Sequence, residues 1–312
     1  MANLYLKLVL TTCVLAFCAV VFSAYARLSD AGLGCENWPA CYEQNSLKQR
    51  QSLKVGVARD HAGWQWRVQN LVGLLLGILA IAICGYSWQK RLELRQSPLL
   101  PSLLLGLMAF LAGFGILAFS YLPRSVIVLV HLAGGIAMLM LLIWMAMNHI
   151  ELHRDTVVGE AWQWQRYAQL GLGLVLFEIL LGGWVSSNFA ALACTDFPYC
   201  QGTLLPSMDF SYDMINDGML LSSERLTAIH WMHRLGALLT IAYMSWLSFR
   251  IMAVRQLRKI GQVILVLVWL QFVIGVSNVL LDIPLAGAVL HNAVAMLILS
   301  ALTLLNFKVQ SR

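Results

Sequence analysis

Three histidines of this chain lie inside long apolar runs, where an ionisable side chain is costly and usually has a function. They are His131, His233 and His291, and each stands six or seven residues into its run. On helices that cross in the same direction, this is a common depth of about 10 Å. Two imidazoles at equal depth on facing helices are what binding a haem iron from both sides requires. The alternative is that each merely hydrogen-bonds a neighbouring helix, but three at one depth favour iron binding.

Small residues and two arginines near the histidines fit the same interpretation. The small residues at 134–135, 236–237 and 286–288 leave room for a macrocycle, although such residues are also common where helices pack. Arg67 and Arg234 are costly inside a bilayer. With haem as the ligand, each could bind a propionate through a charge-assisted hydrogen bond. The alternative is that both extend to the lipid headgroups.

Two loops carry the same cysteine motif, "CENWPAC" at residues 35–41 and "CTDFPYC" at residues 194–200. In an oxidising compartment, Cys35 and Cys41, and likewise Cys194 and Cys200, can close a disulfide across the proline bend. A short exposed disulfide is also readily reduced, so each pair is either a structural link or a redox relay. Zinc is disfavoured because neither loop offers matching histidines close by.

The elements that must position these residues are transmembrane helices. The chain of 312 residues is 60% hydrophobic and only 12% charged, which excludes an ordinary soluble domain. We expect an all-α integral membrane protein with eight transmembrane helices. Their approximate ranges are 5–26, 67–88, 99–121, 125–147, 166–188, 226–249, 260–281 and 285–306.

An internal repeat divides the chain into two halves. Shifting the sequence by about 160 positions places both cysteine motifs in register and His131 on His291, while Arg67 corresponds to Arg234. Because four helices restore the original direction, the halves are expected to be parallel repeats. The fold is therefore predicted to be two pseudo-symmetric four-helix bundles, residues 1–150 and 151–312.

Positive charge predicts the orientation. Lys and Arg are dense at 89–96, 250–259 and the tail 308–312, which places these segments and both termini in the cytoplasm. The long loop 27–66 also carries basic residues, but long loops follow the rule less strictly. The net charge of +6 is explained by cytoplasmic edges meeting anionic lipid, and nothing indicates nucleic-acid binding. We expect a multi-pass protein of a bacterial-type plasma (inner) membrane.

The chain resembles the haem A synthases over essentially its whole length. The resemblance rests on the two similar four-helix halves, "GLGCENWPAC", "ALACTDFPYCQG", "HR" at 233–234 and "LAGAVLHN" at 285–292. It implies oxidation of a methyl group of haem O to a formyl group, which makes haem A for cytochrome oxidase. By position, His233 and His291 would bind a haem b in the second half, and His131 would face the iron of the substrate haem. Cys35 and Cys41 would match cysteines implicated in electron transfer.

The second helix departs from the family pattern. The family has a Glu followed three residues later by "HR", and here Gly63 and Trp66 stand at those positions. His61 precedes Trp66 by five residues, about 7.5 Å along a helix and some 140° around it, so it is out of register with the missing ligand. His61 and Asp60 are possible substitutes, or His61 is an outer-surface residue. The first half would then bind haem through His131 alone, or bind none.

Glu178, a carboxyl group in the fifth run, is a further candidate. It could pair with Arg234, relay protons or serve helix packing. The leading function is a haem A synthase-like oxidoreductase with haem b as cofactor and haem O as substrate. Its expected partners are a haem O-producing enzyme, cytochrome oxidase assembly components, membrane lipid and a second copy of itself. The alternatives are a non-enzymatic haem-binding assembly paralogue, a membrane thiol/quinone oxidoreductase and, last, a transporter.

Overall fold

The computed structural model describes residues 2–30, 64–94, 96–118, 122, 124–151, 163–211 and 221–310. Apart from an isolated backbone bridge between Cys200 and Thr203, the regular structure of these residues is helical. The helices are α1 (Ala2–Asp30), α3 (Trp64–Gln89), α4 (Arg91–Leu94), α5 (Leu99–Ala118), α6 (Arg124–Glu151), α7 (Gln165–Ser187), η3 (Ala190–Ala193), α8 (Ser223–Met252), α9 (Arg258–Leu280) and α10 (Leu285–Val309).

Eight of these helices are long and apolar enough to cross a membrane, namely all except α4 and η3. They form because a segment in lipid must satisfy every backbone polar group within itself, which a helix does. Many of their large apolar side chains are exposed, as expected of helices whose outer faces meet lipid tails instead of water. The predicted set of eight transmembrane helices is therefore confirmed.

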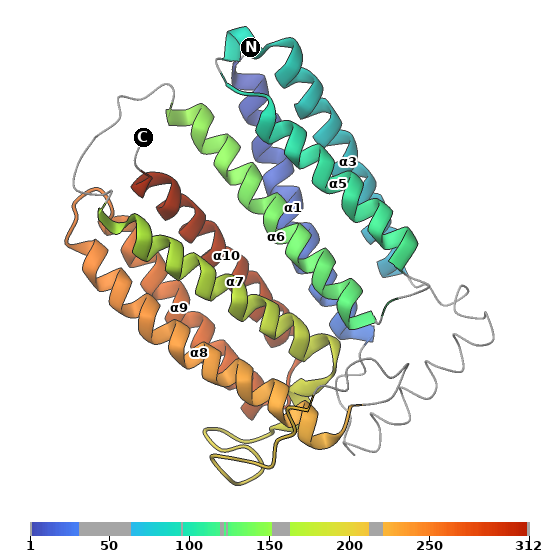
Figure 1. Cartoon of the computed structure of the whole chain (residues 1–312), viewed down its shortest axis with the longest axis vertical. Helices are drawn as coiled ribbons and strands as arrows, with labels where there is room; N and C mark the ends of the chain where they lie inside the picture. Colours follow the sequence, from blue (N-terminus) through green and yellow to red (C-terminus); the bar gives the residue numbers. More distant parts are fainter. Residues whose placement is uncertain are drawn as a thin grey trace.

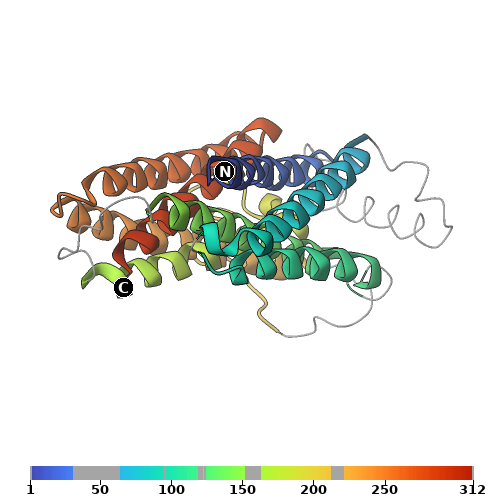
Figure 2. The same cartoon turned by 90° about the horizontal axis from the view of Figure 1, so that it is seen from above.

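The eight helices form two groups of four. In the first group α1 packs on α3 and α6, and α5 packs on the same two helices. In the second group α7 packs on α8 and α10, and so does α9. Each group is therefore a closed square in which α3 and α6, or α8 and α10, occupy opposite corners. The two groups lie side by side in Figure 2, and the symmetry between them stays a prediction.

A shared apolar core joins the two groups. Each group has its own cluster of buried side chains, and a third cluster lies where α6 meets α10. The helices α1 and α7 also contact the opposite group, through α10 and α6 respectively. The residues of the third cluster are Ile136, Leu139, Ile143, Met296 and Leu299.

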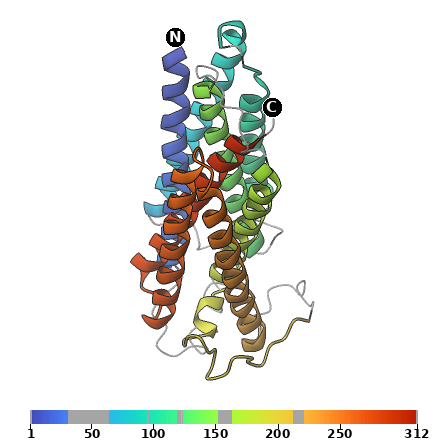
Figure 3. The same cartoon turned by 90° about the vertical axis from the view of Figure 1, so that its left-hand side faces the viewer.

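Both chain ends lie at the same end of the helical assembly, and η3 with the segment that follows it lies at the opposite end (Figures 1 and 3). An even number of crossings requires the termini to share a side. This end-to-end arrangement agrees with the predicted separation of basic segments from the second cysteine motif. The identification of the terminal end as cytoplasmic stays a prediction.

Candidate functional site

Each of the three histidines predicted to bind iron packs its imidazole against a glycine of the preceding helix. A methyl group added at that glycine would come within 3.0–3.2 Å of a ring atom, so no larger residue fits without moving the imidazole. The pairs are His131 with Gly115, His233 with Gly182 and His291 with Gly275. The sequence interpretation missed these glycines. The repeat contained the necessary information, because Gly115 and Gly275 are 160 residues apart, as are His131 and His291.

His131, on α6, is held by its own helix. Its Nδ1 lies 2.9 Å from the backbone oxygen of Ile127, and because a carbonyl only accepts, Nδ1 is the donor. In a neutral imidazole, Nε2 is then the unprotonated nitrogen and can bind a metal. The ring of Phe114 lies 6.0 Å from the His131 ring, and the His131 side chain is exposed on its helix. The residue thus presents a free ring nitrogen at the surface of the first group.

His233, on α8, contacts a carboxyl group of α7. Its Nδ1 lies 2.7 Å from Oε1 of Glu178, and both side chains are largely buried. The distance is short enough for a hydrogen bond, but the oxygen lies out of line with the ring N–H. The two groups are therefore in close polar contact without an aligned hydrogen bond. Of the three roles considered for Glu178, the pairing with Arg234 is not the one observed, because Arg234 binds loop carbonyls. Glu178 faces the neighbouring His233 instead.

His291, on α10, faces the same interior from the opposite corner of the second group. It is close enough to His233 to interact with it electrostatically, and it also interacts with the backbone of Gln271. The Nδ1 atoms of His233 and His291 are buried without an aligned hydrogen-bond partner among the described residues. Two imidazoles on opposite helices fit a haem held by axial ligands from both sides.

A bare metal ion fits the described residues less well. No group of three or more His, Cys, Asp or Glu side chains that could hold a metal ion occurs within the described ranges. Iron within a macrocycle needs only one or two ligands from the protein, because the porphyrin supplies the others. The donor set of the described residues therefore suits haem.

Arg234 binds the loop that carries the second cysteine motif. Its Nη1 donates to the backbone oxygens of Asp196, at 2.9 Å, and Tyr199, at 2.8 Å. Its Nη2 donates to the oxygen of Cys194 at 2.9 Å, and its Nε to Nε2 of His230 at 3.4 Å. Four of its five N–H donors are thus used within the protein. Only one N–H of Arg234 remains for the predicted hydrogen bond to a haem propionate. In the structure the guanidinium binds the loop instead.

Cys194 and Cys200 form the predicted disulfide. The carboxylate of Asp196 accepts the backbone N–H groups of Gln201 and Gly202, both at 2.8 Å. The loop is thus closed by a covalent bond and by hydrogen bonds on both sides. The other predicted pair, Cys35 and Cys41, lies outside the described residues, as do Asp60, His61 and Gly63.

The start of α3 carries the departure from the family pattern. Trp66 is 59% exposed and Arg67 is exposed beside it. The repeat aligns Ser23 with Gly182 (182 − 159) and Gln69 with Gly236 (236 − 167). Nε2 of Gln69 donates to Oγ of Ser23 at 3.3 Å. A polar pair therefore stands where the second group has two glycines, and the corner of the first group opposite α6 offers no histidine among its described residues.

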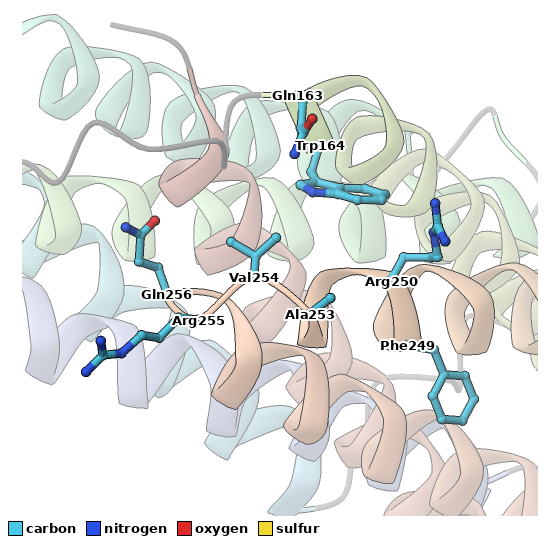
Figure 4. A pocket seen from close by; sticks show the side chains of 8 residues that line it. All are labelled: Gln163, Trp164, Phe249, Arg250, Ala253, Val254, Arg255 and Gln256. Atoms are coloured by element: carbon cyan, nitrogen blue, oxygen red, sulfur yellow. The ribbon is translucent and has the colours of Figure 1, made fainter.

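A pocket of about 610 Å³ lies at the terminal end, away from the histidines. Figure 4 shows Trp164 on one side of it and the turn 253–256 on the other. The guanidinium of Arg250 lies 6.0 Å from the centre of the Trp164 ring, a cation–π contact. Arg250 is 17 residues after His233 on α8, which is about 25 Å along the helix. This pocket is therefore separate from the histidine sites.

Comparison with known proteins gives a match over nearly the whole chain. Residues 6–303 match the model of the COX15-CtaA family, described as cytochrome oxidase assembly protein. The heme A synthase of Shewanella oneidensis is 30% identical over 95% of this chain and 94% of its own length. The heme A synthase of Caulobacter sp. (strain K31) is 26% identical over 95% and 93%. That of Granulibacter bethesdensis is 24% identical over 93% and 83%.

Proposed function

Since the chain belongs to the COX15-CtaA family of cytochrome oxidase assembly proteins, we propose that it is a haem A synthase, a multi-pass membrane enzyme that converts haem O to haem A. The observation that carries the proposal is the placement of His233 and His291. They stand on helices at opposite corners of one helical group, each with its ring against a glycine of the preceding helix, and His131 occupies the fourth helix of the other group. Relatives of similar length named heme A synthase support the same activity.

The second group is proposed to hold the resident haem b. His233 and His291 would hold it, and the glycines Gly182 and Gly275 keep the two imidazoles close to the neighbouring helices. When bound, haem b would supply one-electron transfer to the site where haem O is oxidised. The loop 194–200, bound by Arg234, covers this group at the end opposite the termini.

The first group is proposed to receive haem O, with His131 facing its iron. The hydrogen bond to the carbonyl of Ile127 fixes the imidazole so that Nε2 is available. With Trp66 in place of a second histidine, one protein ligand would bind the substrate iron. A single axial ligand leaves the haem easier to exchange, which suits a substrate that must enter and a product that must leave.

The environment in which this chemistry takes place follows from the family. An assembly protein works alongside the cytochrome oxidase assembly machinery. We propose that a haem O-producing enzyme supplies the substrate, that the protein lies in a bacterial plasma membrane, and that both termini face the cytoplasm. The described basic segments 89–94 and 250–259 lie at the ends of helices, where anionic headgroups bind them.

One observation favours a second candidate, a non-enzymatic haem-binding paralogue that assists oxidase assembly. The first group has Trp66 at the ligand position, and the hydrogen-bonded pair Ser23 and Gln69 stands where the second group has two glycines. In this alternative only the second group binds haem, and the first group has lost the reaction.

Extraction and chromatography of the haem from purified protein, after co-expression with a haem O source, separates the two candidates. Haem A together with haem b is the expected result, and haem b alone would favour the paralogue. The His131→Ala variant is the matched control, because it should lose haem A and keep haem b. Protein without any haem would overturn both candidates.

A further inference from the structure

We propose that Glu178 is a positioning residue for His233, which orients the imidazole and increases its donor strength toward iron. The proposal rests on the proposed function, because it requires haem b at His233. Neither oxygen of Glu178 has an aligned hydrogen bond to another described residue, and Oε1 is 2.7 Å from Nδ1 of His233. A carboxyl group within a transmembrane helix is costly and needs such a partner. Arg234, which follows His233 directly, could also bind the Glu178 carboxyl group, but its guanidinium donates to the loop carbonyls instead.

The contact between Glu178 and His233 is supported from both helices by glycines. The His233 ring packs against Gly182, one turn after Glu178 on α7. The carboxyl group in turn packs against Gly236, three residues after His233 on α8, and a methyl group there would overlap Oε2 of Glu178. The His233 side chain of α8 therefore packs against a glycine of α7, and the Glu178 side chain of α7 packs against a glycine of α8. This reciprocal fit holds the carboxyl group of Glu178 and the imidazole of His233 against each other.

The chemical consequence follows from the two nitrogens of imidazole. A carboxylate that accepts a hydrogen bond from Nδ1–H favours the tautomer in which Nε2 is unprotonated and can bind iron. The same interaction raises the basicity of the ligand and fixes the ring. A more basic ligand stabilises ferric over ferrous iron, and so lowers the midpoint potential.

The first group provides a natural comparison. Leu111 stands four residues before Gly115, as Glu178 stands four before Gly182, and Leu111 packs against Gly134 in the way that Glu178 packs against Gly236. His131 therefore has an apolar neighbour in place of a carboxyl group, and its Nδ1 bonds to a neutral carbonyl of its own helix. The chain gives His233, one of its two proposed haem b ligands, the stronger donor character and its substrate-facing histidine the weaker.

The first test is Glu178→Gln in the purified, haem b-loaded protein. We expect retained haem b, a higher midpoint potential by spectroelectrochemical titration, and a shift in the g-values of the low-spin ferric haem by electron paramagnetic resonance. Phe177→Leu, next to Glu178 but exposed on the lipid-facing surface, is the control and should change neither quantity. Equal haem content with an unchanged potential and spectrum in Glu178→Gln would overturn the proposal.

A second variant keeps the carboxyl group and moves it. Gly236→Ala adds a methyl group that overlaps Oε2 of Glu178, so we expect its potential and spectrum to shift in the same direction as those of Glu178→Gln. It also provides the decisive measurement if Glu178→Gln does not accumulate, because an unchanged spectrum in Gly236→Ala would overturn the proposal. Wild-type protein without haem b would overturn the proposed function as well, whereas normal haem b with unaltered variants would overturn the role of Glu178 alone.

Discussion

The imidazole of His131 lies against the backbone of Gly115, with Nε2 3.2 Å from the position that a β-carbon of Gly115 would occupy. The nitrogen that is free to bind iron is therefore the atom nearest to the neighbouring helix. Any side chain at position 115 pushes on that nitrogen directly. The imidazole of His291 likewise lies against Gly275, although there Cε1 is the ring atom closest to the added β-carbon, at 3.0 Å, so the contact between glycine and imidazole recurs in the repeat.

Gly115→Ala should lower haem A production by at least tenfold, because the added methyl group displaces Nε2 of His131 and misalignment by a fraction of an ångström is costly at a reacting centre. Haem b should remain bound. The matched control is Gly113→Ala on the same helix, where a methyl group meets nothing within 4 Å. Extracted-haem chromatography measures both, and equal haem A in the two variants would contradict the placement of His131 at the substrate.

Arg234→Lys should loosen the loop 194–200. Lysine cannot donate to three separate carbonyls from a planar group, so at least two of the hydrogen bonds to Cys194, Asp196 and Tyr199 are lost. At roughly 1.5–3 kcal/mol for each bond to a charged donor, reduction and alkylation of the disulfide should become more than tenfold faster. Mass spectrometry of labelled cysteines gives the rate. Arg250→Lys, at the opposite end of α8, is the control and should label at the wild-type rate.

The segment around Asp209 should be sensitive to acid. Hydrogen bonds from the backbone and side chain of Ser211, and then from Arg225, lower the pKa of Asp209 from 3.8 to about 2. Because the folded-state pKa is depressed, the stabilisation is complete above about pH 4 and is lost as the pH falls toward 2. Limited proteolysis in lipid nanodiscs with an acid-active protease should show faster cleavage near residue 209 below pH 4.

The Asp209→Asn variant provides the check on this pH dependence. It cannot form the ion pair with Arg225, so its cleavage rate near residue 209 should already be raised at pH 6 and should change little on acidification. A wild-type pH profile in Asp209→Asn would show that another group is responsible.

Restoring a histidine at position 66 should be insufficient by itself to create a second axial ligand in the first group. Ser23 and Gln69 hydrogen-bond where the second group has two glycines, so Trp66→His lacks the space that His233 has. The triple variant with Ser23→Gly and Gln69→Gly supplies it. Pyridine haemochrome assay and optical spectra should show a second six-coordinate haem in the triple variant and not in Trp66→His. Identical spectra in the two variants would mean that the glycines do not make the space.

Sequence patterns were sufficient for the set of eight membrane-spanning helices. Apolar run length predicts the helices, while the common depth of His131, His233 and His291 stays a prediction. The partners of Glu178 and Arg234 were not predictable in this way, because they depend on how each helix is rotated about its axis. Low polarity all around a transmembrane helix conceals that rotation. The rotation of these helices shows in their glycine contacts, and a hydropathy profile carries no information about such contacts.

The buried cluster between α6 and α10, called the seam, has a consequence for electron transfer between the two proposed haems. These are the helices that carry His131 and His291, and Ile136, Leu139, Ile143, Met296 and Leu299 pack them directly together. Close-packed interiors deform little, so the separation of the two histidine sites is set by side-chain volume. An electron passing between them would cross this close-packed seam, whose width stays constant. Its rate would then respond to driving force and reorganisation energy, and not to the opening or closing of the two halves.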